Sequence, residues 1–126
     1  MALYLQAGLT WKLSKTSTQA QYLANRSISL TEAVDIEEYA EHYVEIADAV
    51  TDQAISLGFV TTVKGLLIES DRAITVKING SDTGLPIGHT ADEGGALLLT
   101  ATSVTTLTLS NASGETANIY ISLPGA

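Results

Sequence analysis

Alternating apolar and polar residues in the second half of the chain predict a series of short β-strands. Over 73–78, isoleucine and valine alternate with threonine and lysine, which is the period of a strand with one buried face. The same alternation places Ile119, Ile121 and Leu123 on one face. The expected strands of this half cover 61–69, 73–78, 95–100, 103–110 and 117–123.

Turn-forming residues separate these runs. Asn79-Gly80 is a strong tight-turn dipeptide, and the Gly-rich stretch 81–93 predicts a long loop that holds a short edge strand at 85–87. The segment 111–114, Asn-Ala-Ser-Gly, is expected to join the last two strands as a hairpin loop. Short strands at such spacing predict an all-β protein, an antiparallel β-sandwich or a jelly-roll-like barrel.

The first part of the chain also shows strand patterns. Leu9, Trp11 and Leu13 alternate with polar residues, and 21–31 is strand-like as well. A chain of 126 residues fits one hydrophobic core. We therefore expect a single β-sandwich domain over 1–126, with an N-terminal arm at about 1–15.

The segment 32–52 fits two periods. As a helix, it would gather an apolar stripe that includes Ala40, Tyr43 and Ala47. As a strand, His42, Val44 and Ile46 would share a face, with a turn at 48–53 before a strand at 54–57. We favour β-structure for its latter half because the surrounding chain is β-like, and one short helix within 32–50 is the alternative.

The charge balance argues against several classes of function. The formal net charge is -8 and the six basic residues are scattered, whereas nucleic-acid binding needs clustered Lys and Arg. No cysteine is present to form a disulfide or a thiolate metal site. The first residues lack the basic start of a signal peptide, and no apolar run is long enough to cross a bilayer. We expect no nucleic-acid partner and no membrane association.

The main cluster of candidate ligands is an acidic stretch. It lacks the glycine of a calcium loop, and His42 lacks a Glu three residues before it, as a di-iron helix would need. With only two histidines and no cysteine, zinc is also disfavoured. A solvated acidic face is the expected role of Glu32, Asp35, Glu37, Glu38, Glu41, Glu45, Asp48 and Asp52.

A second polar cluster lies in the long loop, where His89, Asp92 and Glu93 could form a ligand site or a local general base. The chain contains no Gly-x-Ser-x-Gly elbow and no phosphate-binding glycine motif. We expect these three residues to belong to an ordinary hydrated loop. We therefore predict no catalytic, cofactor-binding or metal-binding residues, and a protein that is not an enzyme.

The aromatic residues suggest a sugar-stacking platform as an alternative function. Trp11, Phe59 and the tyrosines could supply it, and Tyr39 and Tyr43 are close enough in sequence to share a patch. Packing in the core or at an interface is the favoured use of these rings.

From about Glu45 onward, the chain resembles small β-sandwich virion proteins of tailed bacteriophages, of the capsid-decorating or head-and-tail accessory kind. The first forty residues have no counterpart in this resemblance. Its motifs are hairpin sequences in a particular order, at 44–46, 54–58, 62–71, 74–80, 94–99, 104–111, 117–121 and Pro124-Gly125.

The resemblance implies a homo-oligomer in the virion, often a trimer, that binds the major capsid protein or other head or tail proteins and carries no catalytic residues. A low-charge, Thr-rich surface with an arm at Leu5 to Leu13 could add a strand to the edge of a neighbour's sheet. The alternative function is a carbohydrate-binding module for host recognition.

Overall fold

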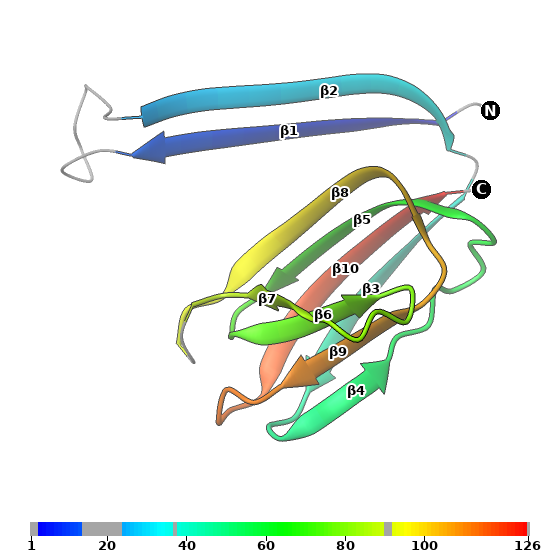
Figure 1. The fold of residues 1–126 in the computed structure, drawn as a ribbon. Coiled ribbons are helices and arrows are strands. Elements are labelled where there is room, and N and C mark those ends of the chain that lie inside the picture. The colour runs from blue at the N-terminus through cyan, green and yellow to red at the C-terminus, as the bar shows by residue number, and fades with distance from the viewer. Residues whose placement is uncertain (1–2, 14–23, 37, 90–91, 126) are drawn as a thin grey trace.

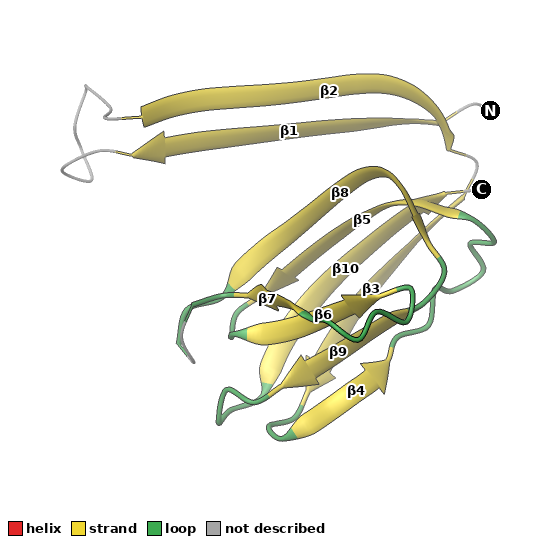
Figure 2. Cartoon of the chain, viewed as in Figure 1, coloured by secondary structure: helices red, strands yellow, loops and turns green. Residues whose placement is uncertain are grey.

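The computed structural model describes residues 3–13, 24–36, 38–89 and 92–125, with side chains described from residue 38 onward except at 100–102. This part of the chain contains ten strands and no helix (Figure 2), so the predicted all-β class is confirmed. The strands are β1 (Leu3–Leu13), β2 (Ala24–Ile36), β3 (Glu38–Ile46), β4 (Val50–Ala54), β5 (Val63–Ser70), β6 (Ile74–Ile78), β7 (Leu85–Ile87), β8 (Gly95–Val104), β9 (Leu107–Asn111) and β10 (Ala117–Gly125).

Strands β3 to β10 form a β-sandwich of two four-stranded antiparallel sheets (Figure 1). The first sheet has the strand order β3-β10-β5-β8, and the second has the order β4-β9-β6-β7. Strands β1 and β2 belong to neither sheet and pair with each other in a separate two-stranded sheet.

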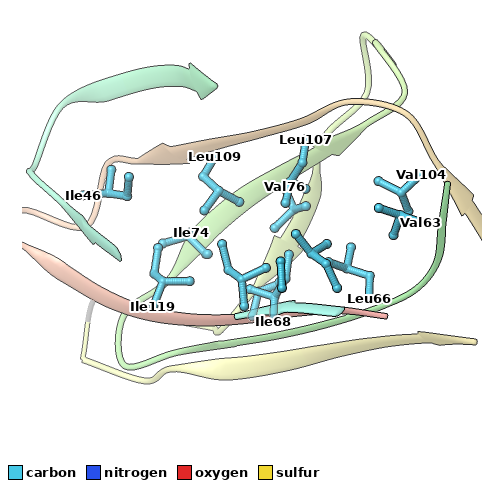
Figure 3. Close-up of a cluster of buried hydrophobic side chains, with 14 of the residues drawn as sticks. Ile46, Val63, Leu66, Ile68, Ile74, Val76, Val104, Leu107, Leu109 and Ile119 are labelled. Carbon is cyan, nitrogen blue, oxygen red and sulfur yellow. The ribbon is translucent and has the colours of Figure 1, made fainter. Parts of the chain in front are cut away.

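The hydrophobic core lies between the two sheets (Figure 3). On β10, every second residue from Ala117 to Leu123 is at most 2% exposed, as the alternation in the sequence predicts. Leu107 and Leu109 of β9 face them from the other sheet (Figure 3 shows both layers). Burying a side chain of this size contributes about 1.5–3 kcal/mol, so these facing rows are the main source of stability.

The described part of 32–50 consists of the end of β2, the whole of β3, a turn at 47–49 and the first residue of β4, so the alternative of a short helix there is wrong. His42, Val44 and Ile46 point inward, whereas Tyr43, which the helical stripe would bury, is 82% exposed. The reason is tertiary: β3 pairs with β10 along its whole length, from Ile46 opposite Ala117 to Glu38 opposite Gly125. The following turn comes earlier than expected, at 47–49, and β4 already begins at Val50.

Most turns in the sandwich carry the chain from one sheet to the other. Among β3 to β10, only β6 and β7 are both consecutive and paired. The predicted hairpin loop at 111–114 is therefore wrong, because β9 and β10 lie in different sheets. The break expected after Thr100 is absent too, since β8 continues to Val104 before the chain changes sheet. The turn at Asn79-Gly80 is confirmed, with positive φ at both residues.

Asn111 stabilises the loop 112–116 that connects β9 in one sheet to β10 in the other, here called the β9–β10 crossing. Its side chain is fully buried, and its Nδ2 donates hydrogen bonds to the carbonyl oxygens of Ile46 (2.9 Å) and Glu115 (2.7 Å). Its Oδ1 accepts a hydrogen bond from the backbone N–H of Ser113 at 3.0 Å. One amide thereby satisfies buried backbone groups of β3 and of the crossing loop, and it joins the two sheets at this end.

The N-terminal strand β1 forms a long antiparallel hairpin with β2. Residues of β1 and β2 pair from Leu13 opposite Ala24 to Leu3 opposite Ile36, with a register shift between Tyr4 and Gln6. The strand expected over 21–31 is confirmed from Ala24, and 21–23 lie outside the described residues. No helix in the described ranges is long and apolar enough to cross a membrane.

Replacing Asn111 by alanine should lower the free energy of unfolding by about 1–3 kcal/mol, because the substitution removes the Nδ2 donor from the buried Ile46 carbonyl and leaves the Glu115 carbonyl with the Ser113 hydroxyl. Urea denaturation would measure the change. Thr116→Ala, at an exposed position near the same crossing, is the matched control and should change stability by less than about 0.5 kcal/mol. Equal midpoints for Asn111→Ala and the wild type would contradict this role of Asn111.

Candidate functional site

The outer face of the sheet β3-β10-β5-β8 carries the most concentrated group of aromatic and acidic side chains among the described residues. On β3, the positions that alternate with the buried ones hold Tyr39, Glu41, Tyr43 and Glu45, all exposed. Buried and outward-facing residues also alternate along much of β10 and β5. Their outward-facing residues therefore add polar and aromatic side chains next to those of β3.

Tyr43 and Tyr120 form an aromatic pair on this face. They are direct partners in the register of β3 and β10, and their ring centroids lie 5.1 Å apart at an interplanar angle of 49°. Tyr43 is almost fully exposed and Tyr120 is half-buried, so the pair presents an accessible aromatic surface. Tyr39 lies on the same face, but four residues along a strand span about 13 Å. The partner of Tyr43 is thus Tyr120, which the sequence did not identify.

An open hollow of about 500 Å³ adjoins the tyrosine pair. Three carboxylate side chains lie around it, from Glu45 of β3, Glu69 at the end of β5 and Asp71 in the turn after β5. Asn118 of β10 completes the polar side of the hollow. The arrangement combines aromatic ring faces with carboxylate acceptors and an amide, a set of groups that can bind the apolar face and the hydroxyl groups of a sugar.

Asp71 is held in its charged form by Asn118. The side-chain amide of Asn118 donates a hydrogen bond to Oδ2 at 2.9 Å, and its backbone N–H donates one to Oδ1 at 2.7 Å. These two bonds hold the pKa of Asp71 below its ordinary value of 3.8. The carboxylate is therefore a fixed acceptor beside the hollow at neutral pH.

Tyr120 keeps its proton over a wide pH range. Burial raises the pKa of its phenol above the ordinary value, a hydrogen bond with the Ser122 side chain opposes the shift, and the nearby Glu41 carboxylate adds to it. The single O–H of the phenol donates to the Glu41 carboxylate, so Tyr120 would contact a ligand mainly through its ring.

The acidic stretch does not form one site. Glu41 and Glu45 point outward from β3, Asp48 accepts a hydrogen bond from the Gly114 N–H at 2.8 Å, and Asp52 forms an ion pair with Lys77 at 3.1 Å. The side chains of β2 are not described, and position 37 lies outside the described residues. Within the part of the chain that is described, no group of three or more His, Asp or Glu side chains is placed to hold a metal ion.

The loop residues His89, Asp92 and Glu93 are only partly brought together. His89 Nδ1 lies 3.7 Å from a Glu93 oxygen, whereas Asp92 pairs with Arg72 at 2.9 Å. Arg72 also contacts Glu115 at 2.5 Å, so it ties the long loop to the β9–β10 crossing. The loop cluster thus contributes an ion-pair network that connects three turns.

Two other hollows have linings with fewer groups that could bind a ligand. One of about 310 Å³ lies between β6, β7 and the β9–β10 crossing and borders His89. Another, of about 540 Å³, opens between the edge strands β3 and β4 and is lined mainly by inward-facing apolar residues such as Val44 and Val50. Neither brings together aromatic rings and carboxylates as the Tyr43–Tyr120 hollow does.

Comparison of the chain with protein-family models, with curated proteins and with solved structures gives no match. The outer face and its aromatic hollow are therefore interpreted from their own geometry.

Asn118→Ala should raise the pKa of Asp71 part of the way toward 3.8, because the variant loses the side-chain hydrogen bond and keeps the backbone one. A lowered carboxyl pKa adds stability above the unfolded-state value, and this contribution disappears as the pH falls through the folded-state pKa. The stability difference between wild type and variant should therefore shrink as the pH falls below about 3.8.

An NMR titration of the Asp71 side-chain carbon measures this pKa. Asn79→Ala, which alters the loop at the opposite end of β6, should leave the titration of Asp71 unchanged and serves as the control. An unaltered Asp71 pKa in Asn118→Ala would show that the amide does not hold the charge.

Proposed function

We propose that this protein is a non-enzymatic structural protein of a virion, of the capsid-decorating or head-and-tail accessory type, which binds other virion proteins as a homo-oligomer. The observation that supports an assembly role is the hairpin of β1 and β2, which forms a sheet of its own outside the sandwich (Figure 1). The resemblance in sequence to phage virion proteins is the reason for proposing a virion as the assembly.

The hairpin is long for a sheet of two strands. Its strands have 11 and 13 residues, which corresponds to roughly 36–43 Å. Two-stranded hairpins are at best marginally stable in water, because each strand leaves one row of backbone N–H and C=O groups unpaired. A contact with another molecule would stabilise such a hairpin, and this is the expected behaviour of an assembly arm.

The surface of the sandwich suits contacts that do not depend on charge. Only 16% of the residues are charged, and Arg72 and Lys77 are engaged in ion pairs within the chain. Main-chain hydrogen bonds and apolar contacts are left as the principal means of association.

The purified protein should therefore form an oligomer whose mass is a multiple of 13.2 kDa. Size-exclusion chromatography with light scattering measures this mass. Raising the salt concentration should not dissociate the oligomer, because screening weakens ion pairs and leaves strand pairing and apolar contacts in place. A strict monomer that also fails to bind capsid or tail components would refute the proposed function.

A second function, carbohydrate binding, is favoured by one specific observation, the accessible Tyr43–Tyr120 pair beside three carboxylates. Sugars stack on exposed aromatic rings through their C–H faces, while carboxylates and amides bind their hydroxyl groups. In this view the outer face of the sheet would recognise a host glycan while the hairpin serves assembly.

Tyr43→Ala should weaken glycan binding about tenfold or more, because it removes half of the aromatic surface. A glycan array would find the ligand, and a titration with the best hit would measure the affinity. Phe59→Ala is the matched control, since Phe59 is an exposed aromatic residue that does not line the hollow. An array without hits, or equal affinity in wild type and Tyr43→Ala, would exclude this site.

A further inference from the structure

We infer that strand β1 of one copy adds to the free edge of β8 in a second copy, so that the hairpin extends the sheet β3-β10-β5-β8 of its neighbour. This inference rests on the proposed homo-oligomeric assembly and names the two surfaces that would build it.

The free edge of β8 carries neither charged residues nor proline, and its ladder with β5 is regular from Gly95 to Thr100, with an irregularity only between Thr100 and Val104. β8 is the last strand of its sheet, and β5 occupies one of its sides. Its ten residues, Gly95–Val104, include no charged residue and no proline. Folded proteins normally protect such edges with charges, proline, bulges or short length, because an open edge pairs with other strands. An edge of this length and composition is suited to a partner strand.

The other three edges of the sandwich are protected. β3 carries the acidic side chains of Glu38, Glu41 and Glu45. β4 is short and has a register shift with a positive φ at Asp52. β7 has three residues and includes Pro86. β8 is therefore the only one of the four sandwich edges that combines a length of ten residues with the absence of charge and proline.

Of the two strands of the hairpin, β1 matches the β8 edge better. β1 has 11 residues and one charged residue, Lys12, whereas β2 contains Arg26, Glu32 and Asp35. In a protein with a net charge of -8, pairing two segments that both lack acidic residues avoids repulsion between the copies. The lengths also agree, since ten residues of β8 face eleven of β1.

Apolar side chains beside the edge would support the added strand. Leu98 of β8 is 40% exposed and pairs across the ladder with Leu67 of β5 on the outer face. A further strand would cover the exposed side of Leu98, as cross-strand neighbours do within a sheet.

The topology favours a second copy over pairing within one chain. β2 ends at Ile36 and β3 begins at Glu38, so the base of the hairpin lies at the start of β3. β3 and β8 are at opposite edges of the sheet, and a strand added to β8 would lie four strand spacings, roughly 19 Å, from β3. The base of a chain's own hairpin is offset from the β8 edge by that distance, and within the described chain β1 pairs with β2 and not with β8, so the edge is left for a second copy. Such a head-to-tail contact closes into a ring or continues as a chain of copies.

Disulfide trapping between two versions of the chain tests this contact, because these 126 residues contain no cysteine. One version carries Leu98→Cys on β8. The other carries one cysteine on β1, at Ala7, Gly8, Leu9 or Thr10 in turn, which samples both faces of the strand. After mixing, exchange and mild oxidation, a cross-linked dimer between the two versions is expected for at least one of these positions.

The matched control replaces Leu98→Cys by Glu41→Cys, which places the thiol on the same face at the opposite edge strand. This version should give no cross-link to β1. Cross-linking to Glu41→Cys in preference to Leu98→Cys, or to neither, would overturn the inference.

A second measurement separates this inference from the proposed function. Leu98→Lys places a charge on the exposed β8 edge and should reduce the oligomer to a monomer, whereas Glu41→Lys should keep the oligomeric mass. Light scattering gives the masses, and circular dichroism confirms that both variants are folded. An oligomer that persists in Leu98→Lys refutes the β8 contact while the assembly role stands. A wild-type monomer that binds no virion component refutes both.

Discussion

The packing of two inner faces against each other is the interaction on which the rest of this structure depends. Alternate residues of β10 and β5 in one sheet face those of β9 and β6 in the other, and most of them are completely excluded from water. Because nearly every turn carries the chain to the opposite sheet, few of these strands form a hairpin that could be stable alone. The sandwich must therefore gain its stability from both layers together.

This construction leaves the outer face and the edges for contacts with other molecules. The pleat that buries Ile119 and Ile121 turns Tyr120 outward, beside Tyr43 of the neighbouring strand. In the same sheet, acidic residues protect the β3 edge while the β8 edge remains uncharged. An aromatic face and an open edge on one sheet are compatible with both proposed roles, glycan recognition and assembly.

The candidate site could be predicted from the sequence only in part. Tyr43 was recognised as a candidate for an exposed aromatic patch, but its partner Tyr120 comes from a strand far away along the chain. The carboxylates of Glu69 and Asp71 likewise join Glu45 only because β10 lies between β5 and β3. The spacing of residues along the sequence does not predict such neighbours, since they are brought together by hydrogen bonds between strands that are far apart in the chain.

By itself, the sequence determined which residues of the sandwich are buried and where most strands lie, because side-chain alternation is a local property of an extended backbone. Only the tertiary structure decided which strands pair and which turns change sheet. Segment 32–52 fits both a helical and a strand period in isolation, and the pairing of 38–46 with β10 selects the strand. Asn111 likewise resembles a hairpin-turn residue, yet its buried amide joins two layers because β3 ends and β10 begins beside it.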